Sequence, residues 1–136
     1  MIETEELYTK LEGFFPKNLD LMRHLHKNAC WEYVITEHST DDTHLKLNFY
    51  LFKKNEISLE MTKNKPEIKP DLILYFTEKA ILSMIEGVST AKEYYERYRN
   101  VMEHPRPGIE VDSKVNKPRL KLWQIGYKQW QKDFKF

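Results

Sequence analysis

Apolar residues recur at the three- and four-residue spacing of a helix near the start of the chain. Thr4 can cap a first helix, and Pro16 ends the run that follows it. A second helix is expected to start near Asn18. The apolar stripes of these helices are Leu7, Leu11, Phe14 and Phe15, then Leu21, Met22 and Leu25. Because both helices are short, they need a partner surface to be stable.

The middle of the chain changes from helical spacing to alternation of apolar and polar residues. Three alternating segments cover residues 31–38, 44–52 and 56–62, and polar turns join them. Their apolar positions are Trp31, Tyr33, Ile35, Leu45, Leu47, Phe49, Leu51, Ile57, Leu59 and Met61. This alternation predicts strands of an antiparallel sheet with one covered face. Residues 71–76 predict a fourth, more continuously apolar strand.

Two helices are predicted after the fourth strand. Thr77 can cap the first of them, and Gly87 supplies its C-terminal stop. Thr90 and Glu93 have the spacing of a capping box at the start of the second helix. The inner stripes of the two helices are Ile81, Met84, Ile85 and Val88, then Ala91, Tyr94, Tyr95 and Tyr98. We expect a polar loop over residues 99–107.

A fifth strand around residues 109–115 and a C-terminal helix complete the pattern. Pro118 suits the first turn of that helix, and Gly126 weakens the helix by roughly 1 kcal/mol relative to alanine. Its apolar stripe consists of Leu120, Trp123, Tyr127, Trp130 and Phe134. Because helices must cover one face of the sheet, the element order predicts an α+β domain of two layers.

Composition and charge narrow the classes of function. The 136 residues suit one domain spanning residues 1–136, and a net charge of +1 argues against a nucleic-acid binder that works by global charge. The lone cysteine, Cys30, cannot form an internal disulfide, so we expect a cytoplasmic protein. The acidic N-terminus lacks the apolar stretch of a signal peptide. Residues 117–136 carry six basic residues and one acid, an asymmetry that can mark a surface contact.

The second half of the chain follows the pattern of a known family. Residues 70–77, PDLILYFT, have the form of a strand that enters a capped helix, and residues 80–87, AILSMIEG, that of an apolar helix closed by glycine. Residues 90–98 fit a short helix, and residues 109–122 fit a final strand, a polar break and a terminal helix. In these features the chain resembles the sterol carrier protein type 2 family.

The resemblance implies a five-stranded, mostly antiparallel sheet covered on one face by about five helices, with an apolar tunnel between the layers. It also implies an intracellular carrier that binds a fatty acyl, acyl-CoA or sterol-like ligand without a cofactor or catalytic residues. Two features depart from the family pattern. Residues 99–107 look like an insertion, and the C-terminus lacks the peroxisomal address that some relatives carry.

The faces expected to meet carry large, adaptable side chains, as a lipid carrier needs. Methionine reshapes around varied ligands, and tyrosine and tryptophan join an apolar body to a polar tip. The residues expected to contact the ligand are Leu47, Phe49, Leu59, Met61, Leu74, Phe76, Ile81, Met84, Ile85, Tyr94, Tyr98, Trp123 and Tyr127. Burial of each ligand methylene would contribute about 0.8 kcal/mol. Each residue taken alone fits a filled core equally well.

Several alternatives stay open at this point. The basic C-terminal helix can lie on an anionic membrane, hold phosphates of an acyl-CoA, or pack on the sheet with a solvated basic face. The outward positions Tyr50 and Phe52 hint at a homodimer. The chain could also be a non-catalytic accessory subunit whose apolar groove binds a partner protein or enzyme. A small hydrolase or isomerase is a third class, for which the sequence offers no polar pair.

A few polar residues resemble parts of a metal or catalytic site. His26 and Cys30 could share one helix face, and His38 and His44 flank a turn, but two ligands do not close a zinc site. Nothing in the sequence orients a histidine against Cys30 for nucleophilic catalysis. We therefore expect no metal, no cofactor and no enzymatic activity.

Overall fold

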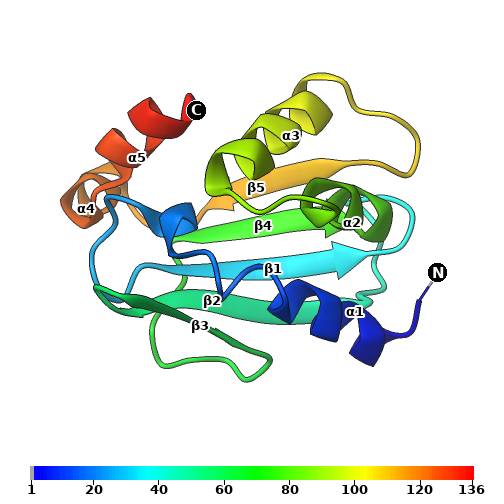
Figure 1. Cartoon of the computed structure of the whole chain (residues 1–136), viewed down its shortest axis with the longest axis horizontal. Helices are drawn as coiled ribbons and strands as arrows, with labels where there is room; N and C mark the ends of the chain where they lie inside the picture. The colour runs from blue at the N-terminus through cyan, green and yellow to red at the C-terminus, as the bar shows by residue number, and fades with distance from the viewer. Residues whose placement is uncertain (1) are drawn as a thin grey trace.

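The computed structural model describes residues 2–136, which contain one five-stranded sheet (Figure 1). The strands are β1 (Cys30–Thr36), β2 (Leu47–Asn55), β3 (Ser58–Thr62), β4 (Leu72–Thr77) and β5 (Val111–Val115). They lie in the order β3-β2-β1-β4-β5. β1 pairs parallel with β4, and the other neighbouring pairs are antiparallel. The prediction of a mostly antiparallel five-stranded sheet is confirmed.

Helices precede, separate and follow the strands in the predicted order. The helices are α1 (Thr4–Glu12), the 3₁₀ helix η1 (Leu19–Met22), α2 (Glu78–Ile85), α3 (Ala91–Glu103), α4 (Arg119–Ile125) and α5 (Tyr127–Phe134). Tyr8 of α1 contacts Phe49 of β2, whereas α2 and α3 pack near β4 and β5 (Figure 1). Within residues 2–136, no helix has both the length and the apolar character needed to cross a bilayer.

The helices cover one face of the sheet, where alternate strand residues form the core. Tyr33 of β1 stacks between Phe49 of β2 and Phe76 of β4, with ring centroids 4.5 and 5.8 Å away. Phe15, which follows α1, packs on the same tyrosine at 5.1 Å. All four side chains are at most 1% exposed. Because strand residues of one parity meet the helices, the two-layer arrangement follows from the alternation in the sequence.

The predicted starts of α2 and α3 are confirmed by their caps. The Thr77 hydroxyl accepts a hydrogen bond from Ala80 N, and the Thr90 hydroxyl accepts one from Glu93 N. The prediction for Thr4 is wrong by one residue. Thr4 lies inside α1 and donates its hydroxyl proton to the Lys46 carbonyl, which ties the helix to the sheet.

Two predicted inner positions lie on the surface instead. Leu45 precedes β2 and is 55% exposed, and Ile57 lies in the turn before β3 and is 81% exposed. The strands begin three and two residues later than the alternation suggested, because turn residues continued the apolar pattern by chance. Tyr50 points away from the helices as expected but is buried, so it offers little surface to a second copy of the chain.

The C-terminal helix differs most from its prediction. Gly126 adopts φ +112° and separates α4 from α5. A Cβ at this position would lie 2.1 Å from the His24 carbonyl oxygen, so only glycine allows this close approach. The break divides the predicted stripe: Leu120 and Trp123 lie on the surface, whereas the α5 residues of the stripe are buried. The helix α3 also continues to Glu103, through part of the predicted polar loop.

Candidate functional site

An apolar groove of about 170 Å³ lies between the sheet and the helices α3 and α5. Its floor consists of two rows that cross β1, β4 and β5. The rows are Trp31, Leu72 and Val115, then Tyr33, Leu74 and Ser113. The pairing register sets each row, and residues two apart on a strand point to the same side of the sheet. The floor therefore runs from the central strand to the edge strand.

The roof of the groove comes from two helical segments distant in sequence. Its residues are Tyr94, Tyr95, Tyr98 and Met102 of α3, with Trp130, Gln131 and Phe136 of the C-terminal segment. The three α3 positions 94, 98 and 102 are four residues apart, so they share one face of that helix. No charged side chain of the described chain lines the groove. This lining suits an apolar ligand with few polar groups.

The groove opens beside the edge strand, where its apolar residues are exposed. Met102 is 49% exposed, Val115 59% and Phe136 39%. The Phe136 ring stacks on Trp130 with ring centroids 5.3 Å apart, and the Arg99 guanidinium lies 5.7 Å from the centroid of the Phe136 ring. Phe136 thus occupies the outer part of the groove, held by contacts on the protein surface.

Burial raises the pKa of the groove tyrosines, which are neutral at pH 7 even at their ordinary pKa. Desolvation raises the pKa of Tyr33 and Tyr94 well above the ordinary value of 10, and it raises the pKa of Tyr98 to about 12. Tyr95 also has a raised pKa, and its hydroxyl donates to the Leu21 carbonyl at 2.8 Å. The groove therefore carries hydroxyl groups but no charge at neutral pH.

A buried polar network closes one end of the groove. Trp31 Nε1 donates to the Tyr127 hydroxyl at 2.8 Å, and that hydroxyl donates to Asp71 Oδ2 at 2.7 Å. The same carboxylate oxygen accepts the Cys30 backbone N–H, while Oδ1 forms an ion pair with Lys117 Nζ at 2.5 Å. This second contact is an ion pair only, because its geometry makes no hydrogen bond to Oδ1. The network joins α5 to the sheet across its central strands.

The structure brings only some of the expected ligand residues to the groove. Leu74, Tyr94 and Tyr98 line it. The hydrophobic core that continues beyond the groove holds Leu47, Phe49, Leu59, Phe76, Ile81 and Met84, with Met61 and Ile85 packed at its margin. Trp123 lies on the surface, and Tyr127 is buried in the network around Asp71.

Sequence reasoning missed most of the groove residues, although the sequence pattern had placed several of them on inner faces. Tyr95 and Trp130 already stood on predicted inner stripes, and Trp31 and Tyr33 on a predicted inner strand face. What the pattern could not supply was the pairing register that sets these residues beside β5. Asp71 was missed because it reads as the polar start of a strand, whereas the structure buries it completely.

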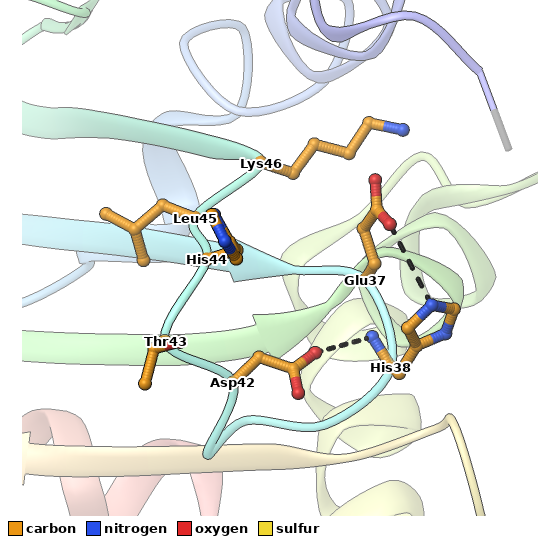
Figure 2. A pocket seen from close by; sticks show the side chains of 7 residues that line it. All are labelled: Glu37, His38, Asp42, Thr43, His44, Leu45 and Lys46. Atoms are coloured by element: carbon orange, nitrogen blue, oxygen red, sulfur yellow. Dashed lines mark hydrogen bonds and ion pairs between the residues drawn. The ribbon is translucent and has the colours of Figure 1, made fainter.

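A second hollow, of about 450 Å³, lies at the opposite end of β1 and has a different character (Figure 2). The loop after β1 carries His38 and Asp42, whose carboxylate accepts the His38 backbone N–H. Backbone hydrogen bonds lower the Asp42 pKa. Lys46 extends away from this loop and pairs with buried Glu78 at 2.5 Å. Because most of its lining residues are exposed on the surface loop, we favour the smaller apolar groove as the functional site.

The histidines and the cysteine do not assemble into a metal site. Residues 2–136 contain no cluster of three or more histidine, cysteine or acidic side chains placed to hold a metal ion. Cys30 is buried, and desolvation raises the pKa of its thiol to about 12. A thiol with such a pKa stays protonated at neutral pH and is a poor nucleophile. Comparison with known proteins adds nothing to this picture, since neither a protein-family model nor a curated protein matches the chain.

Proposed function

We propose that this protein is a non-catalytic lipid carrier that holds an apolar ligand in the groove between β1, β4, β5 and the helices α3 and α5. The observation that carries the proposal is an uncharged, largely aromatic groove that opens through three exposed apolar residues, Met102, Val115 and Phe136. The resemblance of residues 70–122 to the sterol carrier protein type 2 family supports the same function.

The volume of the groove limits the size of the ligand that it can enclose in this conformation. Pockets for drug-sized ligands measure about 300–1,000 Å³, whereas a cavity of about 150 Å³ in another protein binds benzene. A volume of about 170 Å³ therefore suits one ring or a short stretch of alkyl chain. A longer lipid continues past the rim, where displacement of the Phe136 ring would lengthen the groove toward solvent.

Binding in this groove is driven by the burial of apolar surface. Each ligand methylene that leaves water contributes about 0.8 kcal/mol, so five or six methylenes account for roughly 4–5 kcal/mol before entropic costs. Without a charged group in the lining, the site offers no acid–base pair or nucleophile. The proposal therefore assigns the protein the role of binding and carrying a molecule rather than converting it.

Lipid analysis of the protein purified from its native source tests this function. Organic extraction followed by mass spectrometry should recover a co-purifying lipid in near-stoichiometric amount. Leu74→Trp, which fills the groove floor, should remove that lipid, whereas Ile73→Trp on the opposite side of β4 should retain it. A lipid-free protein that instead co-purifies with a stoichiometric protein partner would support the accessory-subunit alternative and contradict the carrier.

The surface of α4 suggests where such a carrier collects its ligand. Leu120 is 69% exposed and Trp123 43% exposed, on one side of the short helix. Arg119 and Lys128 lie over the Trp123 ring at 5.8 and 5.1 Å, and neither approaches a carboxylate in residues 2–136 within ion-pair distance. An aromatic and aliphatic pair beside free cations matches the interface of an anionic membrane. We propose that this surface docks on anionic lipid.

Vesicle co-sedimentation at low salt tests this membrane contact. Binding is expected with vesicles that contain phosphatidylserine and should be much weaker with phosphatidylcholine alone. Trp123→Ala and Lys128→Glu should each reduce binding, whereas Ile57→Ala, which removes a more exposed residue elsewhere, should not. Equal and negligible binding to both vesicle types would rule out the membrane contact without affecting the groove.

A further inference from the structure

Three tyrosine hydroxyls in the groove have no partner in the protein. Tyr33, Tyr94 and Tyr98 are 1%, 2% and 7% exposed, and all three line the groove. Their hydroxyls form no hydrogen bond with any atom of residues 2–136. In contrast, the hydroxyls of Tyr95 and Tyr127 bond to the Leu21 carbonyl and to Asp71. Buried hydroxyls are normally hydrogen-bonded, so three unpartnered ones in one groove need an explanation.

The three tyrosine oxygens are not sealed off inside the protein, and the groove is a hollow that all three residues line. The only side-chain oxygens of residues 2–136 that are both sealed off and without a hydrogen bond are Asp71 Oδ1 and Glu78 Oε1. The three tyrosine oxygens therefore retain accessible surface although their rings are packed. Tyr33 lies on the central strand of the floor, and Tyr94 and Tyr98 lie on one face of α3. The ring centroids of Tyr94 and Tyr98 are 6.4 Å apart. The groove thus has hydroxyls at its inner end and apolar side chains at its rim.

We infer that the groove binds its ligand with one neutral polar group, a hydroxyl or a carbonyl oxygen, directed inward to these three tyrosines. This inference rests on the proposed carrier function and adds the class and the orientation of the ligand. A tyrosine hydroxyl both donates and accepts, so the cluster can satisfy an alcohol or a ketone. A ligand oxygen bound there would supply the partner that these hydroxyls lack within residues 2–136.

A charged group is a poor fit at the inner end of the groove. A carboxylate there would lose its hydration and gain no cationic partner, because no lysine, arginine or histidine of the described chain lines the groove. The ligand class is therefore a mostly apolar molecule with a single alcohol or carbonyl oxygen, rather than a fatty acid bound head first. A purely hydrocarbon ligand would displace water from the hydroxyls and leave them unsatisfied.

Three small probes with the same ring size separate these cases. Cyclohexanol, methylcyclohexane and cyclohexanecarboxylate are titrated at pH 8 into the full chain, and the dissociation constants are read from chemical-shift changes of the tyrosine rings. In the wild type, cyclohexanol should bind at least about tenfold more tightly than the carboxylate. Substituting Tyr33→Phe, Tyr94→Phe or Tyr98→Phe should weaken cyclohexanol binding about two- to tenfold relative to methylcyclohexane.

Tyr95→Phe is the matched control, because Tyr95 lines the same groove but its hydroxyl already bonds to the Leu21 carbonyl. This control should lower the melting temperature and leave the ratio of alcohol to hydrocarbon affinity unchanged. The three test variants should melt at or above the wild-type temperature, since they remove unpartnered hydroxyls. Two results would overturn the inference and leave the carrier proposal standing. In the first, both neutral probes bind but the ratio of alcohol to hydrocarbon affinity is the same in the three test variants as in the wild type. In the second, the carboxylate binds the wild type as tightly as cyclohexanol does. If no probe binds, both fail.

Discussion

The helical layer meets the two halves of the sheet in different ways. Over β2 and the β2 side of β1, Phe49 packs against Phe15 and the Tyr33 ring, and all three side chains are at most 1% exposed. Over β4 and β5, the floor residues Leu74 and Ser113 lie beneath the groove. The comparison shows that a filled core and an open groove can be built on one sheet face from the same types of residue.

Side-chain size and chain direction explain this difference. The β5 edge contributes the smaller residues Ser113 and Val115 to the floor. In the other half of the sheet, β2 contributes Leu47, Phe49 and Leu51 to the core. Above the β5 edge, the turn at Gly126 directs α5 along η1, and the His26 backbone N–H donates to the Ile125 carbonyl next to that turn. Because α5 is fixed to the N-terminal segment rather than to β5, the space over the edge strand stays open.

The largest expected effect comes from removing a ring in the filled half. Phe49→Ala should lower the free energy of unfolding by about 3–5 kcal/mol, because it creates a cavity among packed rings. Leu74→Ala, at the groove floor, should cost less than about 2 kcal/mol, since that side chain already borders open space. Urea unfolding of both variants measures the contrast, and equal losses would mean that the two halves are packed alike.

A smaller loss is expected at the turn that holds the groove open. Gly126→Ala combines a left-handed backbone with a Cβ 2.1 Å from the His24 carbonyl oxygen, and should destabilise the protein by about 2–4 kcal/mol. Gly87→Ala is the control, with φ +69° but no atom within 4 Å of the added Cβ, so only the backbone cost of about 1–2 kcal/mol applies. Thermal unfolding that ranks the two variants equally would contradict the close approach at Gly126.

Alkaline pH should weaken the groove half. Burial raises the pKa of Tyr98 from 10.0 to about 12, so between these values the folded state keeps a proton that the unfolded state has lost. The contribution of Tyr98 to the free energy of unfolding is therefore fully present below pH 10. It falls by about 2 kcal/mol as the pH rises toward 12. Urea unfolding at pH 9 and pH 11 should show a smaller decline for Tyr98→Phe than for the wild type. Parallel declines would show that Tyr98 is not desolvated in the folded protein.

The smallest expected effect concerns the ring at the mouth of the groove. Phe136→Ala should lower stability less than Phe49→Ala, because the ring is 39% exposed although it packs on Tyr95, Tyr98 and Trp130. It should tighten the binding of a fluorescent fatty alcohol about two- to tenfold, since the outer groove becomes free for the alkyl chain. Met102→Ala, which removes a rim residue without freeing the groove axis, is the comparison. Weaker binding to Phe136→Ala would mean that this ring is part of the binding surface.

Much of the fold was predictable because local signals agree with it. The caps Thr77 and Thr90 and the inner tyrosines of α3 were read correctly, since capping and periodicity depend on residues close in sequence. The errors at Leu45 and Ile57 have the opposite cause. Each apolar turn residue extended an alternating run, and only tertiary pairing decides where the strand begins.

The site was less predictable than the fold. That the chain has apolar inner faces follows from its pattern, but whether those faces meet depends on register and on the turn at Gly126, which no local signal specifies. Phe49 and Leu74 look alike in sequence, yet one is enclosed and the other lines the groove. The burial of Asp71 with Lys117 likewise requires β1, β5 and α5 to come together.

Titration with a fluorescent fatty alcohol tests the central claim, that an apolar molecule binds in the groove, most directly. The wild type should show saturable binding with one probe per chain. Leu74→Trp, which fills the floor, should weaken that binding at least about tenfold, whereas Ile73→Trp, on the opposite side of the same strand, should match the wild type. Binding that is absent, or equally strong in all three proteins, would contradict the claim.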